Sequence, residues 1–292
     1  MDPVVTVGLD GSPESLAAAR WAAGQAERRR LTLRLLHAWP MLAPEPTRLP
    51  AEVDQNYWAK RLVHNARAEL QARHPSLTIV GNLVADDAEH ALLQAASESE
   101  MVVLGSRGLE PVASYFLGDI GMPVVSRAAR PVVLVRAGSP GTEQEPISND
   151  LGGVVVVALK LHGPCDDLLE FAFTSAAALG APLRAVHGRS LPLHAHVPWG
   201  VDHDLTERIR KEAHTDLLQV LRPWREKFPQ VIAADSVRLE SPARAVLHAA
   251  ADAALLVVGR REHRPALAPH LGGVASAAVH HARCPVAVVP HG

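Results

Sequence analysis

The sequence is poor in features that mark several large classes of protein. Only two cysteines occur among 292 residues, which provides no disulfide framework and suits a reducing compartment. No apolar run reaches the roughly 18 residues that a membrane-spanning helix needs. The chain starts with the acidic Asp2 and then an apolar, strand-like segment, so it lacks the pattern of a signal peptide. These absences predict a soluble, cytoplasmic protein with no membrane partner.

An excess of charge of either sign is also lacking. The chain has 29 basic and 31 acidic side chains, and its formal net charge is −2. Nucleic acids and anionic membranes usually bind a clustered basic face, so the composition argues against both as main partners. Aromatic residues make up 4% of the chain while 48% of it is hydrophobic, which predicts cores built mainly from Ala, Val and Leu.

What the chain does have is a repeat of itself. Residues 4–7 (Val-Val-Thr-Val) are echoed by 154–157 (Val-Val-Val-Val), and residues 102–105 (Val-Val-Leu-Gly) by 256–259 (Leu-Val-Val-Gly). Solenoid repeats have periods of roughly 20–50 residues, so a repeat this long indicates a duplicated domain. The predicted division is a first domain at 1–137, a linker at 138–152 rich in Gly, Pro, Ser and acids, and a second domain at 153–292.

Apolar runs alternate with helical patterns along each copy. This alternation predicts an α/β fold: two tandem, doubly wound, Rossmann-like domains, each with a parallel five-stranded sheet and right-handed crossovers. The second copy has the same order with a longer loop at 188–203. The elements expected in the first copy are strands at 4–9, 31–39, 77–84, 101–104 and 131–135, helices at 13–30, 55–73, 88–98 and after Gly118, and loops at 40–54 and 105–118.

A ligand site is expected where the strand order of such a sheet reverses, beyond the carboxyl ends of the strands. Residues 8–12 follow the first strand and residues 105–108 follow the fourth, so these segments should face each other across a crevice. The glycines of the second segment allow close approach of the backbone. Gly118 leads into a helix whose N–H groups favour an anion, Arg107 adds a positive charge, and Asp10 can accept hydrogen bonds from a ribose. The pattern indicates a nucleotide pocket.

The spacing Gly105-x2-Gly108-x9-Gly118, in a duplicated β/α domain that opens on Val-x-Val-x-x-Asp, resembles the universal stress protein family. The resemblance covers essentially the whole chain. It implies that the first copy binds ATP in a stress-response regulatory module, with Asp10 holding the ribose and the backbone near Leu9 and Ala38 framing the adenine. The residues implied to form the site are Gly8, Leu9, Asp10, Ser12, Ala38, Leu104, Gly105, Ser106, Arg107, Gly108, Gly118, Asp119 and Ile120.

Asp119 departs from the family pattern, which has Ser or Thr directly after the last glycine. A carboxylate repels a triphosphate unless a divalent cation bridges them, and Asp is also a good helix N-cap that can occupy the N–H groups a phosphate would use. This departure favours AMP, ADP or Mg²⁺-bound ATP as ligands over free ATP.

The second copy departs further from the pattern. Lys160 stands where Asp10 stands in the first copy, Glu262 replaces the middle glycine, and Gly273 replaces Asp119. These changes predict that the second copy has lost nucleotide binding and serves as a scaffold. A small anion held near basic residues is the alternative, because Gly273 leaves its helix start uncapped.

No catalytic constellation is evident, so an enzyme is not expected. The chain has neither a P-loop pattern nor a Gly-x-Ser-x-Gly elbow. His280, His281 and Cys284 supply no fourth zinc ligand, and the histidines at 194, 196 and 203 read as surface residues, so no metal site is expected. The alternatives are a weak ATPase that holds Mg²⁺ through Asp119, and an interaction protein that acts without nucleotide.

The family resemblance also implies that the domains pair through their last strands. Val132–Arg136 would pair antiparallel with residues 286–290 within one chain and make a pseudo-dimer. Such pairing would cover an apolar strand edge that is otherwise exposed. Further association into a homodimer and a regulatory protein partner are open expectations.

Overall fold

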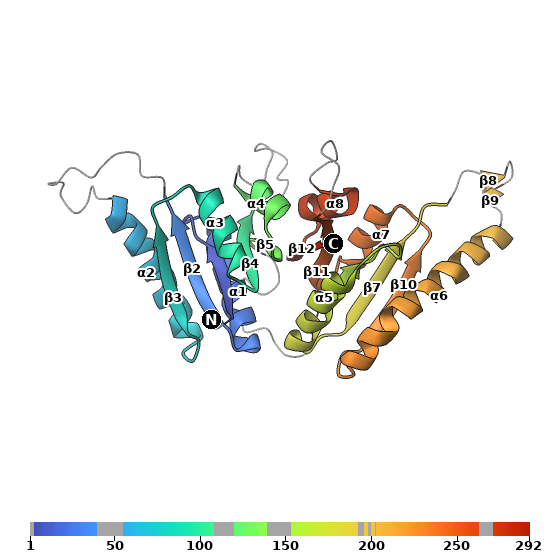
Figure 1. Cartoon of the computed structure of the whole chain (residues 1–292), viewed down its shortest axis with the longest axis horizontal. Coiled ribbons are helices and arrows are strands. Elements are labelled where there is room, and N and C mark those ends of the chain that lie inside the picture. The colour runs from blue at the N-terminus through green and yellow to red at the C-terminus, as the bar shows by residue number, and fades with distance from the viewer. Residues whose placement is uncertain are drawn as a thin grey trace. The chain divides into compact units, whose positions relative to one another are not determined.

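Two β/α units follow one another along the chain, Met1–Ile147 and Ser148–Gly292 (Figure 1). The structure is a computed structural model, and it describes residues 3–39, 55–107, 120–138, 153–191, 196–197, 200–201, 203–262 and 271–292. The predicted loop at 40–54 and nearly all of the predicted linker lie outside these ranges. The pairing of the last strands of the two units stays a prediction.

The first unit is a parallel sheet of five strands in the order β5-β4-β1-β2-β3. The strand order reverses at β1, which lies between β4 and β2, so the doubly wound sheet predicted from the sequence is confirmed. Its elements are β1 (Val4–Gly8), α1 (Pro13–Arg29), β2 (Thr32–Ala38), α2 (Gln55–Arg73), β3 (Ile79–Val84), α3 (Ala88–Ser97), β4 (Met101–Ser106), α4 (Gly121–Arg127) and β5 (Val132–Arg136).

Helices cover both faces of this sheet, which explains its continuous apolar strands. Helices α1 and α2 contact each other on one side of the sheet, and α3 and α4 contact each other on the other (Figure 1). Val5 and Val7 of β1 are fully buried, as is Val103 of β4. The side chain of Ser12 caps α1 by accepting a hydrogen bond from Ser15 N at 3.1 Å. The helix ends where Arg30 takes a left-handed conformation with φ 56°.

The second unit repeats the arrangement, with its parallel strands in the order β10-β7-β6-β11-β12. It differs from the predicted pattern in the loop at 188–203, which contains a short antiparallel pair of strands, β8 and β9. Its elements are β6 (Val154–Ala158), α5 (Asp166–Leu179), β7 (Leu183–Gly188), β8 (His196–Val197), β9 (Gly200–Val201), α6 (His203–Lys227), β10 (Ala233–Arg238), α7 (Pro242–Ala249), β11 (Ala253–Arg261), α8 (Gly273–His281) and β12 (Val286–His291).

The fourth strand of the first unit is longer than the sequence pattern predicts. β4 runs to Ser106. Gly105 and Ser106 are therefore strand residues, whereas the sequence pattern placed them at the start of a loop at 105–118. The reason is that β5 continues beside them, with Gly105 opposite Val135 and Ser106 opposite Arg136. None of the described helices is long and apolar enough to cross a membrane.

Candidate functional site

The predicted site of the first unit is at the ends of β1 and β4, which lie side by side. Val7 of β1 is in register with Val103 of β4, which brings the following Gly8 beside Leu104. A β-carbon on Gly8 would come within 2.9 Å of Leu104 Cδ2, so the absence of a side chain lets the two strand ends approach. The structure therefore places together the two segments that were expected to face each other.

Asp10 follows the end of β1 by two residues and is exposed at the strand ends. Its Oδ1 accepts hydrogen bonds from Ser12 N at 2.8 Å and from Ser12 Oγ at 2.6 Å. Partial burial acts to raise the pKa of this carboxyl, but the hydrogen bonds from Ser12, Ser15 and the backbone together outweigh burial and hold the pKa below its ordinary value. Asp10 is thus a fixed, ionised acceptor at the point where the strand order reverses.

His37 joins the ends of β1 and β2, a role that the sequence did not indicate. Its Nδ1 lies 2.7 Å from the carbonyl oxygen of Leu9, and its ring stacks on Trp39 with centroids 6.0 Å apart. Leu9 N also donates to Leu36 O at 2.8 Å, so the backbone beside Ala38 is held from two directions. The repeat carried a usable signal, because His187 makes the same contact to Leu159 O at 3.0 Å.

Gly105 has a packing role in addition to the close approach expected of it. A β-carbon there would lie 2.6 Å from Ser15 N and 2.5 Å from the carbonyl carbon of Glu14. The first turn of α1 therefore rests on β4 at this glycine. The next residue, Ser106, is 3% exposed and its Oγ has no hydrogen-bond partner among the described residues, while Arg107 is exposed.

Three predicted site residues, Gly108, Gly118 and Asp119, lie outside the described residues. Ile120, which the family resemblance places in the site, directly precedes α4 and is 41% exposed. The part of the site that the structure describes is thus the end of β1, β2 and β4, with Asp10 as its charged group.

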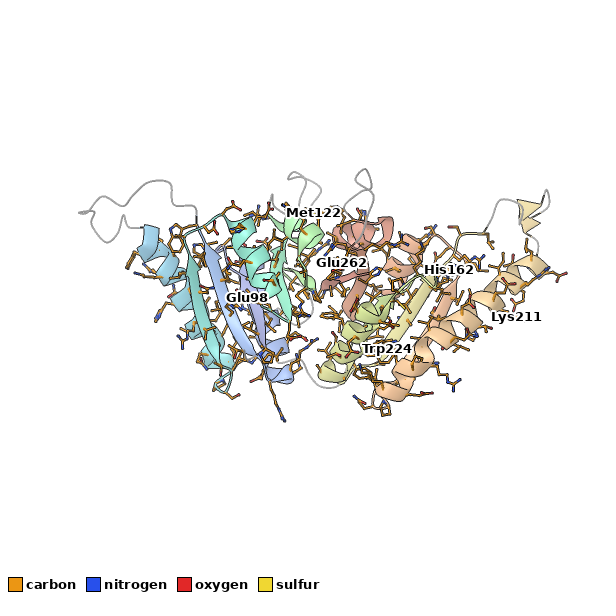
Figure 2. The ribbon with its side chains drawn as sticks, in the orientation of Figure 1. Glu98, Met122, His162, Lys211, Trp224 and Glu262 are labelled. Carbon is orange, nitrogen blue, oxygen red and sulfur yellow. The ribbon has the colours of Figure 1, made fainter. Side chains whose placement is uncertain are left out.

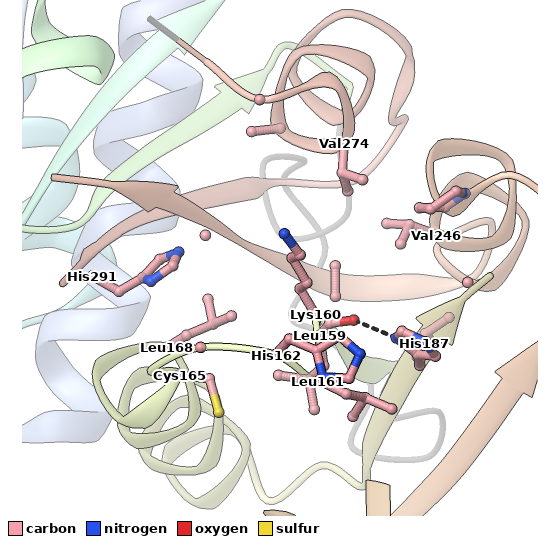
Figure 3. A pocket seen from close by; sticks show the side chains of 18 of the residues that line it. Leu159, Lys160, Leu161, His162, Cys165, Leu168, His187, Val246, Val274 and His291 are labelled. Atoms are coloured by element: carbon pink, nitrogen blue, oxygen red, sulfur yellow. Dashed lines mark hydrogen bonds between the residues drawn. The ribbon is translucent and has the colours of Figure 1, made fainter. Parts of the chain in front are cut away.

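The second unit has a pocket at the equivalent strand ends (Figure 3). Its volume is about 980 Å³, and it is lined by residues at the ends of β6, β7, β11 and β12 and by the start of α8. Basic side chains of Lys160, Arg189 and Arg261 line it together with the acidic Asp216. The sequence changes that predicted a scaffold role have not filled this space with side chains.

Cys165 and the histidines do not form a reactive site in the described part of the chain. Burial raises the pKa of the Cys165 thiol and the charge of Asp166 raises it further, so this thiol stays protonated near neutral pH. The His280 and His281 rings lie 6.5 Å apart in an edge-on arrangement. Among the described residues, no group of three or more His, Cys, Asp or Glu side chains could hold a metal ion.

Comparison with known proteins covers both units. The profile of the universal stress protein family matches residues 3–136 and 153–290. Universal stress protein Rv2005c of Mycobacterium tuberculosis is 31% identical, over 97% of this chain and 96% of that protein. Universal stress protein Rv1996 of the same species is 27% identical, over 97% of this chain and 94% of that protein. The crystal structure of a universal stress protein from Archaeoglobus fulgidus matches at a TM-score of 0.66 and 17% identity, over 99% of this chain and 98% of that one.

Proposed function

The chain belongs to the universal stress protein family as two tandem domains, and on this basis we propose that its first unit binds an adenine nucleotide. The proposed ligands are AMP, ADP or ATP, the last with Mg²⁺. Nucleotide occupancy would then regulate the binding of a protein partner in a cytoplasmic stress response. The proposed action is binding, without a catalytic step.

The observation that carries this proposal is the position and state of Asp10. A carboxylate accepts hydrogen bonds only, and the two hydroxyls of a ribose are donors that match it. The Ser12 hydrogen bonds keep Asp10 ionised and fix its orientation before a ligand arrives, which lowers the entropy that binding would cost.

The backbone at the ends of β1 and β2 suits a flat, uncharged base. His37 and the Leu9–Leu36 hydrogen bond hold these strand ends together, so the groups beside Ala38 present a rigid edge. A base placed there would bring its ribose toward Asp10. The phosphates would then extend toward the loop that follows β4.

Calorimetric titration of the full chain with ATP, ADP and AMP, with and without Mg²⁺, tests this assignment. Wild-type protein is expected to bind in the first unit, and Asp10→Asn to weaken binding at least about tenfold. The reason is that a hydrogen bond to a charged group contributes about 1.5–3 kcal/mol, and about 1.4 kcal/mol is a factor of ten.

Glu98→Gln is the matched control for Asp10→Asn. Glu98 ends α3 three residues before β4, at the amino ends of the strands and away from the predicted site, and pairs with Arg34 at 2.8 Å. This variant is expected to bind nucleotide like the wild type. Unchanged affinity in Asp10→Asn would contradict the proposed site, and an absence of binding under every condition would favour an interaction protein that needs no nucleotide. Mg²⁺-dependent release of phosphate from ATP would instead support the weak ATPase.

A further inference from the structure

The pocket of the second unit has a charged group of the opposite sign at the position of Asp10. Lys160 follows β6 by two residues, as Asp10 follows β1, and the preceding leucines make the same backbone hydrogen bond: Leu9 to Leu36 O and Leu159 to Val186 O. The histidine contact is also repeated at His187 (Figure 3). The crevice backbone is therefore duplicated, while its central side chain is changed from an acceptor into a donor.

Lys160 reaches into the open part of this pocket (Figure 3). It makes no ion pair or hydrogen bond with any residue that the structure describes. A lysine ammonium has three donors and no acceptor, so it cannot replace a carboxylate as the acceptor for ribose hydroxyls. An ammonium that projects into a concave site does raise the local positive potential and attracts anions.

The start of α8 adds donors to the same pocket. Gly272 is the N-cap of this helix and Gly273 its first residue, and a glycine N-cap has no side chain that could occupy the first-turn N–H groups. A β-carbon on either glycine would meet nothing within 4 Å, so the space in front of them is open. An ammonium together with the N-terminus of a helix is a common way to bind phosphate.

We propose that the second unit binds a small phosphorylated ligand through Lys160 and the start of α8, and that the phosphate rather than a ribose is recognised. Arg189 and Arg261 also line the pocket, and Asp216 is the one acidic residue among the described residues of its lining, so the charges of these residues favour an anion. This inference is independent of nucleotide binding in the first unit, because it depends on a different residue in a different pocket.

Titration of the full chain with inorganic pyrophosphate tests the proposal. Wild-type protein is expected to bind it, and Lys160→Gln to weaken binding at least about tenfold, since one charge-assisted contact is lost. Lys160→Asp, which introduces the residue type of the first unit, should abolish binding through repulsion. Binding should also weaken at about 1 M salt, where the screening length is only about 3 Å.

The matched control is Lys211→Gln, because Lys211 projects from α6 and does not line the pocket (Figure 2). It should bind pyrophosphate within about twofold of wild type. Asp10→Asn should leave pyrophosphate binding unchanged, which separates this site from the nucleotide site. Titration of that variant with ADP and adenosine distinguishes free from nucleotide-borne phosphate. ADP, whose binding to the first unit is weakened in this variant, should still bind to the second unit through Lys160, and adenosine should not bind there.

Three results would overturn the proposal. They are wild-type protein that binds no pyrophosphate, a Lys160→Gln variant that binds it as tightly as wild type, and binding that disappears in Asp10→Asn. Lys160 is exposed, so its replacement should not impair folding. Equal thermal unfolding temperatures of Lys160→Gln, Lys160→Asp and wild type would verify that.

Discussion

Single residues decide the charge that the ends of the two first strands offer to a ligand, since the backbone contacts just before these residues are shared. Asp10 and Lys160 follow equivalent strands, and each is preceded by a leucine held by the same two contacts. Changing only the side chain at this point changes the sign of the charge offered to a ligand. The consequence is that a duplicated fold does not by itself imply a duplicated ligand.

Gly105 is the residue whose replacement should disturb the first unit most directly. In Gly105→Ala the new β-carbon would lie 2.5–2.8 Å from backbone atoms of Glu14 and Ser15, which cannot move without shifting α1. We expect the free energy of unfolding to fall by about 1–3 kcal/mol, the usual cost of overpacking. Urea unfolding followed by circular dichroism measures this difference.

Gly273→Ala is the matched control for that substitution. Gly273 is the first residue of α8 and has open space around its missing β-carbon, so alanine should change stability by no more than about 0.5 kcal/mol. Equal changes in the free energy of unfolding for the two substitutions would contradict this explanation. They would mean that the close contact between α1 and β4 is not the reason for a glycine at position 105.

At the level of elements, α6 is attached to its sheet by an apolar stripe and by one acidic residue. Ile209, Ala213, Leu217 and Leu221 are the buried residues of this helix. Asp235 of β10 bonds to two side chains of α6, with Arg225 Nη2 at 2.8 Å from Oδ1 and His214 Nε2 at 2.8 Å from Oδ2. The carboxylate thus ties the helix to the outermost strand of the second unit's sheet.

This attachment should make stability depend on pH. Partial burial acts to raise the pKa of Asp235, but the hydrogen bonds and charges of Arg225 and His214 outweigh it and hold the pKa below 3.8. A carboxyl whose pKa is lowered by folding stabilises the protein at pH values above its unfolded-state pKa. That contribution is lost as the pH falls through the folded-state pKa. Asp235→Asn should therefore lower the free energy of unfolding by about 1 kcal/mol at neutral pH, and by less at about pH 3.

Urea titrations of wild type and Asp235→Asn across this pH range check the expectation. Glu212→Gln on the same helix is the control, because Glu212 is exposed and pairs with no described residue, so it should have little effect at either pH. A cost for Asp235→Asn that stays the same at low pH would mean that the ionised carboxylate does not provide the stabilisation.

At the scale of the whole molecule, each unit has its own buried core. In the second unit Phe173 is fully buried, and its ring stacks on Phe228 and Trp224 with centroids 5.5 and 6.1 Å away (Figure 2 labels Trp224). In the first unit Leu33 and Leu35 of β2 are fully buried within a separate set of aliphatic side chains. Separate cores predict that damage to one unit leaves the other folded.

Phe173→Ala should destabilise the second unit by about 3–5 kcal/mol, the usual cost of removing a buried aromatic ring. Hydrogen exchange of the full chain, measured peptide by peptide, should show faster exchange in β6, β7 and α5 and unchanged exchange in β1 and β4. Leu35→Ala provides the reciprocal variant, which should affect the first unit alone. Faster exchange in both units from either change would contradict independent folding.

The order of elements could be predicted because the residues that form it are local signals repeated in each copy. Apolar β-branched runs, the Ser12-Pro13 helix start and the echoed Gly105 and Gly259 each act within a few residues. The extension of β4 to Ser106 could not be predicted this way, because it depends on β5 lying beside it. The same holds for the Asp235 attachment, whose partners lie 10 and 21 residues away in the sequence.

The sequence by itself determined the fold class, the duplication, the family and the candidate residues at the strand ends, because these depend on residue type and order. Only the tertiary structure decided that Asp10 is held by Ser12, that His37 joins two strand ends, and that a pocket persists beside Lys160. The physical reason is that hydrogen bonds and cavities depend on distances between atoms brought together by folding. Sequence spacing alone does not specify those distances.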